Sequence, residues 1–409
     1  MTRRIAIVFL LALLGFAAWV AWANRMQAEP PAPPMEGFAA ERIARGAYLA
    51  RAGNCMACHT TKGGTPYAGG RGIETPFGVV YAGNLTPDPE TGLGHWRPDD
   101  FWQALHHGRS KDGRLLYPAF PYPAFTRVTR ADSDALYSYL QSLPPARQAN
   151  LPHELRWPTN QAWALAVWRA LFFKPEPFVP DAQQSPLWNR GAYLVQGLGH
   201  CASCHAPRNA LGATLSTPSL DGGLMPAQGW HAPGLGGRQE AVDLVELLRT
   251  GQSPRGAALG PMAEVVLHST QHLLDSDLQA MAVYLGTQPE PTDRAPPQDA
   301  PALDLLQRGA QLYTQHCATC HAEQGDGHGL YPPLAGNRSV NLLAPHNVIQ
   351  AIRKGGFAPN TTANPRPFGM PPFGHVLTDA ELAAVATHVR RSWGNTAPVV
   401  TELQVLKAK

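Results

Sequence analysis

Six cysteines fall in one repeated five-residue pattern, and this pattern has the clearest chemistry in the sequence. Cys-x-x-Cys-His occurs three times, at Cys55, Cys58 and His59, at Cys201, Cys204 and His205, and at Cys317, Cys320 and His321. Two thiols at this spacing, followed by an imidazole, are typical of covalent haem c attachment. The thiols add to the haem vinyl groups, and the histidine binds the iron as its proximal ligand.

Paired cysteines have other uses, which are zinc sites, redox-active dithiols and disulfides. A zinc site would need further thiols or a second pair of histidines at fixed spacing, and the sequence contains neither. All six cysteines are used by the three motifs. The pattern therefore predicts three covalently bound haem c groups.

The sixth ligand of a haem iron is usually methionine or histidine. Met370 stands in a Pro-rich loop before the last apolar helix, and we predict that it binds the third iron. Met262 has the corresponding place after the second motif, so we predict that it binds the second iron. Met225 and Met281 are rivals for that role, although Met281 suits core packing and Met225 comes early in the repeat.

The first motif breaks this pattern, because no methionine lies between Cys58 and Arg147. Phe120 stands where the methionine is expected, and a phenylalanine ring cannot bind iron. We therefore expect the first haem to have a different sixth ligand or to be five-coordinate. The candidate ligands are His95, His106 and His107. No residue is predicted to be catalytic.

The elements around the motifs also repeat. A short helix is predicted before each motif, at residues 45–49, 190–194 and 308–312, where Arg-Gly-Ala recurs. An amphipathic helix is predicted after each, at residues 134–143, 277–285 and 379–393. Such internal similarity indicates one structural unit used three times. With 39 Gly and 40 Pro in 409 residues, we expect a mainly α fold with long loops and little sheet.

These signals divide the chain into a series of segments. The predicted segments are a membrane anchor or signal peptide at 1–24, a Pro-rich linker at 25–37, a first haem domain at 38–150, an inter-domain helix and linker at 151–185, a second haem domain at 186–290, a linker at 291–302, a third haem domain at 303–396 and a C-terminal tail at 397–409.

The N-terminus carries an export signal. Arg3 and Arg4 precede an uncharged apolar stretch, residues 5–23, which is close to the ~20 residues that a membrane span needs. We predict a retained anchor with the arginines inside. Because Ala21-Trp-Ala23 resembles a cleavage site, a cleaved signal peptide is the alternative. Both place the haem domains outside, on the periplasmic face of an inner (cytoplasmic) membrane.

The net charge is only +3, with 15% charged residues and no basic run, which excludes nucleic acid as an expected partner. The apolar segment at residues 162–173 is too short to span a membrane. It could lie at a membrane surface, pack on a partner or form a buried inter-domain helix, and we favour the buried helix.

Several further stretches, taken together and in order, carry a resemblance to a known family. They are residues 75–78, 84–88, 116–122, 188–194, 197–201 and 369–371. Over nearly its full length the chain resembles the triple-haem cytochrome c subunits of membrane-associated bacterial dehydrogenases. The resemblance implies three tandem cytochrome c-like domains that pass electrons from a periplasmic catalytic subunit to ubiquinone in the membrane.

The family serves PQQ alcohol dehydrogenases, flavin-dependent sugar and sugar-acid dehydrogenases, and molybdenum hydroxylases of aldehydes or N-heterocycles. The stretch Tyr117-Pro-Ala-Phe-Pro-Tyr122 looks like the molybdenum-hydroxylase group, whose catalytic subunits carry molybdopterin and iron–sulfur clusters. The alternatives are a self-sufficient peroxidase or thiosulfate-oxidising enzyme that uses an open first haem, and a soluble electron shuttle.

Overall fold

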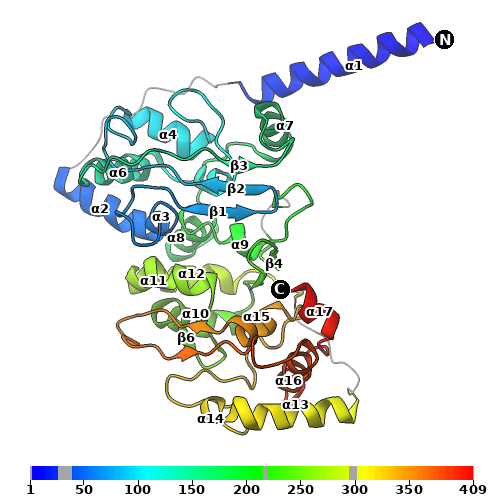
Figure 1. The fold of residues 1–409 in the computed structure, drawn as a ribbon. Helices are drawn as coiled ribbons and strands as arrows, with labels where there is room; N and C mark the ends of the chain where they lie inside the picture. Colours follow the sequence, from blue (N-terminus) through cyan, green and yellow to red (C-terminus); the bar gives the residue numbers. More distant parts are fainter. Residues whose placement is uncertain (1, 26–38, 215–218, 294–301, 409) are drawn as a thin grey trace. The chain divides into compact units, whose positions relative to one another are not determined.

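The computed structural model describes residues 2–25, 39–214, 219–293 and 302–408. The Pro-rich linker predicted at 25–37 lies almost entirely outside the described residues, as does most of the linker predicted at 291–302. Helices predominate, and the described strands form four small antiparallel sheets (Figure 1). The prediction of a mainly α fold with little sheet is therefore confirmed.

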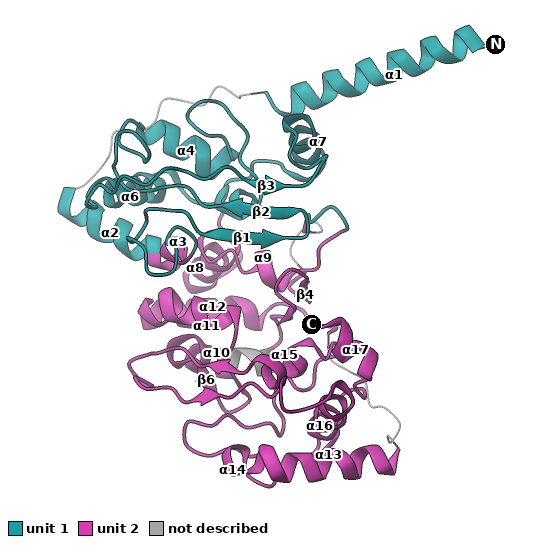
Figure 2. Ribbon diagram, viewed as in Figure 1, with its two compact units in different colours: residues 1–50, 58–179, 210–213 teal, residues 51–57, 180–209, 214–409 magenta. Residues whose placement is uncertain are grey.

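The chain divides into two compact units (Figure 2). Unit 1 consists of residues 1–50, 58–179 and 210–213, and unit 2 consists of residues 51–57, 180–209 and 214–409. The second and third cysteine motifs thus belong to one unit, where the sequence predicts two domains. The division into three tandem haem domains stays a prediction.

The elements from the N-terminus through residue 179 are mostly helical. They are α1 (Thr2–Ala23), α2 (Ala39–Ala52), α3 (Cys55–Cys58), β1 (Gly72–Thr75), β2 (Gly78–Tyr81), α4 (Pro98–His107), α5 (Tyr122–Phe125), α6 (Arg130–Gln141), β3 (Glu154–Leu155) and α7 (Ala162–Phe172). Strands β1, β2 and β3 form one sheet in that order. Helix α1 is long and apolar enough to cross a membrane.

The elements from residue 180 onward are also mostly helices, with short strands between them. The helices are α8 (Pro186–Tyr193), a π-helical turn (Leu194–Leu198), α9 (Ala202–His205), α10 (Arg238–Thr250), α11 (Pro261–His268), a 3₁₀ turn (Thr270–His272), α12 (Asp275–Gly286), α13 (Leu303–His316), α14 (Ala318–His321), α15 (His346–Lys354), α16 (Asp379–Arg391) and α17 (Glu402–Lys407). The strands form three hairpins, β4–β5 (Gly222–Met225 and Trp230–Pro233), β6–β7 (Gln252–Ser253 and Gly256–Ala257) and β8–β9 (Gly356–Phe357 and Gly369–Met370).

Each motif has the predicted helix before it and the predicted helix after it. The pairs are α2 with α6, α8 with α12, and α13 with α16. A glycine brings each pair together, because a Cβ at Gly46, Gly191 or Gly309 would lie 1.9, 1.9 or 2.4 Å from a carbonyl oxygen of the closing helix. Only glycine allows the backbones to approach so closely. The repeated Arg-Gly-Ala is thus a helix-crossing signal.

The arginine before each of these glycines pairs with an acid in the first turn of the closing helix. The pairs are Arg45 with Asp132 at 2.5 Å, Arg190 with Asp277 at 2.7 Å and Arg308 with Glu381 at 3.0 Å. Glu381 also accepts a hydrogen bond from the backbone N–H of Thr378, which completes a capping box at the start of α16. Glu381 therefore both caps the start of α16 and joins it to Arg308 of α13.

The C-terminal segment packs more tightly than a tail. Val400 and Val405 are 3% and 0% exposed and belong to the core cluster that contains α16. The guanidinium of buried Arg390 donates to the carbonyl oxygens of Pro398, Val340 and Leu342. Residues 397–408 are thus held by apolar burial and by one arginine.

Helix α7 is more exposed than the sequence led us to expect. Trp163 and Leu171 are 59% and 50% exposed, so the interpretation of residues 162–173 as a buried helix is wrong. The reason is that α7 buries the face that carries Arg169, which is 5% exposed, and leaves an apolar face outward.

Candidate functional site

Each cysteine motif forms a short helical turn. In the second motif the N–H groups of Cys204 and His205 both donate to the carbonyl oxygen of Cys201, and the third motif repeats this at Cys317. Residues three and four positions apart lie on one face of a helical turn. Both thiols and the imidazole of each motif therefore point to the same side.

Each of the three motif histidines makes a hydrogen bond between its Nδ1 atom and a backbone carbonyl oxygen. The Nδ1 atom of His59 lies 2.7 Å from the carbonyl oxygen of Gly83, that of His205 lies 2.6 Å from Pro233, and that of His321 lies 3.0 Å from Pro332. A carbonyl can only accept, so Nδ1 carries the proton and Nε2 keeps its lone pair. This is the tautomer that a proximal ligand needs, with its ring orientation fixed.

Burial keeps these imidazoles neutral. Removal from water lowers the pKa of His59 and His321, and it lowers the pKa of His205 to about 4. A neutral imidazole is the form that binds a metal. The three rings are therefore in the right protonation state at neutral pH.

The second and third motifs of unit 2 face one largely apolar cavity of about 430 Å³. Its lining includes Cys201, Cys204, His205, Cys317, Cys320 and His321. An apolar cavity whose lining carries two pairs of thiols, each followed by an imidazole, fits porphyrins, whose faces are apolar. The donor set and its surroundings therefore fit haem c.

Four methionines line the same cavity, namely Met225, Met262, Met281 and Met370. Met370 lies in β9 and packs against the same core cluster as Cys317, which associates it with the third motif. Met262 is in the first turn of α11. Because its rivals Met225 and Met281 also reach the cavity, the roles of Met262 and Met370 as ligands stay predictions.

The predicted sixth position of the first site is aromatic. The ring of Phe120 packs against Phe125, with centroids 5.4 Å apart, and against Tyr122 at 6.5 Å. Tyr122 is fully buried. The Tyr-Pro-Ala-Phe-Pro-Tyr stretch is thus an aromatic cluster.

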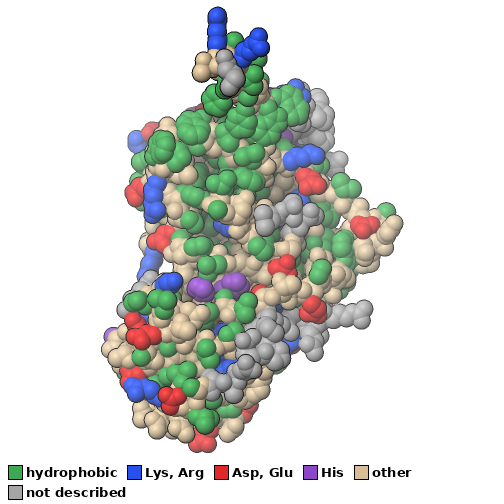
Figure 3. Space-filling view, turned by 90° about the vertical axis from the view of Figure 1, so that its right-hand side faces the viewer, with side chains coloured by type: hydrophobic (Ala, Val, Ile, Leu, Met, Phe, Trp, Pro, Cys, Tyr) green, Lys and Arg blue, Asp and Glu red, His purple; other side chains and the backbone are tan. Residues whose placement is uncertain are grey.

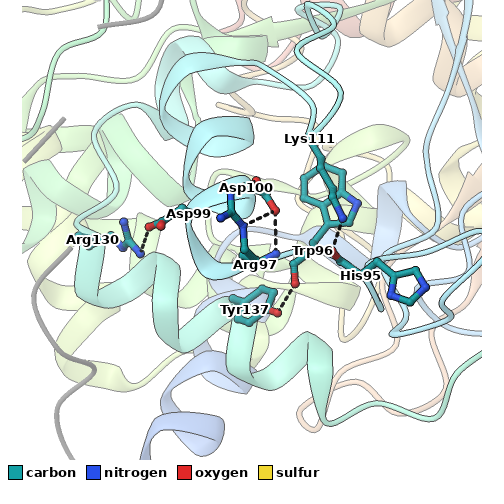
Figure 4. A network of polar contacts seen from close by, with 8 residues as sticks. All are labelled: His95, Trp96, Arg97, Asp99, Asp100, Lys111, Arg130 and Tyr137. Atoms are coloured by element: carbon teal, nitrogen blue, oxygen red, sulfur yellow. Dashed lines mark hydrogen bonds and ion pairs between the residues drawn. The ribbon is translucent and has the colours of Figure 1, made fainter. Parts of the chain in front are cut away.

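The candidate histidines of the first site differ in their surroundings. His106 is buried at the end of α4 and stacks on Trp102, with centroids 4.4 Å apart, and His107 lies against His106. His95 is exposed, and its ring points away from the polar network at the start of α4 (Figure 4). Its exposure makes His95 the weakest of the three candidates.

That network fixes where α4 begins. Asp100 accepts hydrogen bonds from the backbone and side chain of Arg97, and the hydroxyl of Tyr137 donates to the carbonyl oxygen of Trp96 at 2.6 Å (Figure 4). Arg130 joins Asp99 to α6 at 2.7 Å. The polar contacts hold α4, which carries His106 and His107, against the closing helix of the first repeat.

Cys201 and Cys317 are poorly suited to thiolate chemistry. Burial raises the pKa of Cys201 to about 12 and that of Cys317 to about 11. Zinc ligation and thiol–disulfide exchange need the thiolate. Among the described residues, no group of three or more His, Cys, Asp or Glu side chains is placed to hold a metal ion.

Sequence reasoning missed the three carbonyl acceptors and the acidic partners of the Arg-Gly-Ala arginines. A backbone acceptor leaves no side-chain signature, so Gly83, Pro233 and Pro332 could not have been found. The acids had a signal, because Asp132, Asp277 and Glu381 all stand in the first turn of an amphipathic helix.

Comparisons with known proteins agree on one family. The cytochrome c family model matches residues 43–144 and 306–393. The gluconate 2-dehydrogenase cytochrome c subunit of Pantoea cypripedii is 40% identical, over 87% of this chain and 86% of that protein. The cytochrome c subunit of the quinone alcohol dehydrogenase of Gluconobacter oxydans (strain 621H) is 39% identical, over 87% and 79%.

A third relative is longer. A nicotinate dehydrogenase subunit of Pseudomonas putida is 39% identical over 96% of this chain but only 33% of its own length. Among solved structures, a thiosulfate dehydrogenase (TsdBA) of Marichromatium purpuratum is 18% identical, over 89% of this chain and 72% of that one, with a TM-score of 0.18. That score is too low to bear on fold or function.

Proposed function

Because the chain belongs to the cytochrome c subunits of dehydrogenase complexes, we propose that it is a three-haem relay between a periplasmic dehydrogenase and membrane ubiquinone. As in that family, it is an electron-transfer subunit and not the catalytic one. One observation carries the count of three: each Cys-x-x-Cys-His turn has its histidine Nδ1 bonded to a backbone carbonyl.

The chain's own residues would hold the cofactors in a repeated way. The thiols of Cys55 and Cys58, of Cys201 and Cys204, and of Cys317 and Cys320 would form the thioether bonds. Nε2 of His59, His205 and His321 would bind the irons, and Met262 and Met370 would complete the second and third sites. Haem c, when bound, supplies a one-electron carrier at each motif.

The arrangement in unit 2 favours transfer between its two sites. Since both motifs open into one cavity, the apolar lining would exclude water from both cofactors. The hydrogen bonds at Nδ1 would hold the ligand rings still when the charge of the iron changes. The protein thus contributes orientation, burial and ligand choice.

We favour a molybdenum hydroxylase of aldehydes or N-heterocycles as the catalytic partner. The basis is the stretch Tyr117-Pro-Ala-Phe-Pro-Tyr122, which has Phe120 at the place of the expected methionine and looks like the molybdenum-hydroxylase group. The nicotinate dehydrogenase relative supports this choice, since nicotinate is an N-heterocycle. The gluconate and alcohol relatives are equally similar, so a PQQ or flavin partner is the competing proposal.

We place the protein at the inner membrane, with its haem units in the periplasm. Helix α1 has the length and composition of a membrane span, and the two arginines at its start fit the cytoplasmic side. Retention of α1 would keep the relay close to its quinone acceptor.

The test is to purify the protein from native membranes through a C-terminal tag and to identify the cofactor of any large subunit that accompanies it. Molybdopterin with iron–sulfur clusters would support the favoured partner. PQQ or flavin would contradict the proposal based on Phe120. Absence of any dehydrogenase, together with peroxide or thiosulfate turnover by the purified chain, would contradict the relay itself.

A further inference from the structure

We propose that the outward face of α7 rests on the lipid headgroup region of the bilayer, beside the anchor α1. This surface, the α7 face, consists of Trp163, Val167 and Leu171. The inference rests on the proposed function in one respect, which is that α1 remains in the chain as a membrane span.

The composition of the α7 face is the first argument. Its three residues are spaced four apart and therefore share one side of the helix. Trp163 and Leu171 are 59% and 50% exposed. The single charged residue of α7, Arg169, is buried on the other side at 5% exposure. A helix that faces water carries its polar residues outward, and α7 does the reverse.

The polar junction at the end of α1 is the second argument. The side chain of Asn24 donates to the carbonyl oxygen of Ala166 in α7 at 2.8 Å. Arg169 donates from Nε to Asn24 Oδ1 at 3.2 Å, and from Nη2 to the carbonyl oxygen of His107 at 2.7 Å. Arg109 adds a hydrogen bond to the carbonyl oxygen of Asn24. The end of the anchor is thereby fixed to α7 and to Arg109, just after the end of α4.

The length of α1 then determines how deep α7 lies relative to the bilayer. A helix of 22 residues is about 33 Å long at ~1.5 Å per residue, and the hydrocarbon core is ~30 Å thick. If α1 spans the bilayer, Asn24 lies at the outer interface. Ala166, which is hydrogen-bonded to Asn24, must lie at the same level.

The side chains around this junction have the chemistry of a membrane interface. Trp19 and Trp22, near the end of α1, are 38% and 59% exposed, and Trp157, which precedes α7 in the sequence, is 77% exposed. Tryptophan is enriched at the headgroup level. Figure 3 shows hydrophobic side chains gathered where α1 leaves the body of unit 1. Exposed Arg156 and Lys174 flank α7 in the sequence, which suits anionic lipids.

The experiment uses the haem-loaded full chain with a cysteine at Val167→Cys, modified with a nitroxide. Under the proposed function all six native cysteines are thioethers, so the new thiol is the only reactive one. Thr65→Cys, at an exposed position of unit 1, is the matched control. Leu171→Cys serves as a second probe of the same face if Val167→Cys folds poorly.

Each protein is reconstituted in vesicles of phosphatidylcholine and phosphatidylglycerol. Collision rates with oxygen, which enters lipid, and with a nickel chelate, which stays in water, are measured by electron spin resonance. We expect the ratio of oxygen to nickel collisions to be severalfold higher at position 167 than at position 65.

Equal ratios at the two positions, in protein that floats with the vesicles, would overturn the inference and leave the anchor intact. Protection of position 167 only after the catalytic subunit is added would also overturn it, because the α7 face would then bind protein. Failure to float would remove its premise and contradict the proposed anchor, and the flotation assay shows this separately.

Discussion

At the residue scale, the hydrogen bond at each Nδ1 decides how the histidine can act. The Nδ1–H group of His205 donates to the carbonyl oxygen of Pro233, in surroundings that lower the pKa of the imidazole to about 4. The proton therefore stays on Nδ1, and Nε2 keeps the lone pair that the proposed ligation to iron needs. The same logic applies at His59 and His321 with other carbonyl partners.

The first prediction concerns Phe120. The substitution Phe120→Met places a thioether where the other two repeats have one, and a methionine ligand raises the reduction potential of its haem. We expect the long-wavelength Fe(III)–Met absorption band to correspond to two haems in the natural protein and to three in the variant. If the intensity of this band in the natural protein already corresponds to three haems, the first site already has a methionine ligand and the prediction is wrong.

The second prediction concerns Tyr122. Burial raises the pKa of its phenol from 10.0 to about 12, partly offset by Arg169. A raised folded pKa means that its contribution is fully present below pH 10 and is lost as the pH rises toward 12. Stability against urea should fall by roughly 2 kcal/mol over this window because of this one group.

The control for Tyr122 is Tyr122→Phe, whose ring cannot ionise. Between pH 10 and pH 12, the stability of Tyr122→Phe against urea should fall by ~2 kcal/mol less than that of the natural protein. Urea midpoints, followed by the haem circular dichroism of the first site, measure this difference. Identical pH profiles for the two proteins would contradict the prediction.

Single residues also show what the sequence could reveal. Cysteines and histidines carry their chemistry in the side chain, so a fixed spacing was enough to find all three motifs. Which methionine binds an iron depends on its position in the folded protein, and four methionines line one cavity. The polar junction of Asn24 with Arg169 joins residues 145 positions apart, and local sequence pattern contains no trace of it.

At the element scale, the three helix crossings have a common design, and the third prediction tests it. In Gly191→Ala the new Cβ would meet the carbonyl oxygen of Ala280 at 1.9 Å, so α8 and α12 must separate. Overpacking of this kind costs ~1–3 kcal/mol. We expect the free energy of unfolding of unit 2 to fall by at least that amount.

Gly256→Ala is the matched control, because the nearest atom to its Cβ would be 3.8 Å away, an ordinary contact. Urea titrations of both variants, followed by the haem absorption, should separate them clearly. Equal losses of stability would mean that the close crossing at Gly191 is unimportant.

The helices before and after each motif could be predicted because amphipathic periodicity is a local property. The packing of residues 397–408 could not, since it depends on carbonyl groups near Val340 that bond to Arg390. The exposure of α7 was also missed. An apolar segment of this length has the same sequence pattern whether it faces a core or a lipid surface.

At the scale of the whole molecule, the cavity of unit 2 links the second and third sites. The fourth prediction is that the double variant Cys317→Ala, Cys320→Ala binds two haems instead of three, as measured by the pyridine haemochrome assay. Because the sites share apolar lining, the melting temperature of unit 2 should also fall, while that of unit 1 should not change.

The matched variant is Cys55→Ala, Cys58→Ala, which removes the first attachment site instead. Cys55 belongs to unit 2 and Cys58 to unit 1, but neither thiol is among the residues that line the cavity. It should also bind two haems, but the second and third sites should keep their natural stability and spectra. Equal damage to unit 2 in both variants would contradict the link through the shared cavity.

Under the proposed function, the shared cavity also constrains the order in which the protein matures during export. Its lining extends along the chain from Ala52 to Val389, so the wall would be incomplete until residue 389 has crossed the membrane. The second site would therefore stay open to solvent and to proteases until the third repeat has followed it. A chain that stops early would lose two cofactors rather than one.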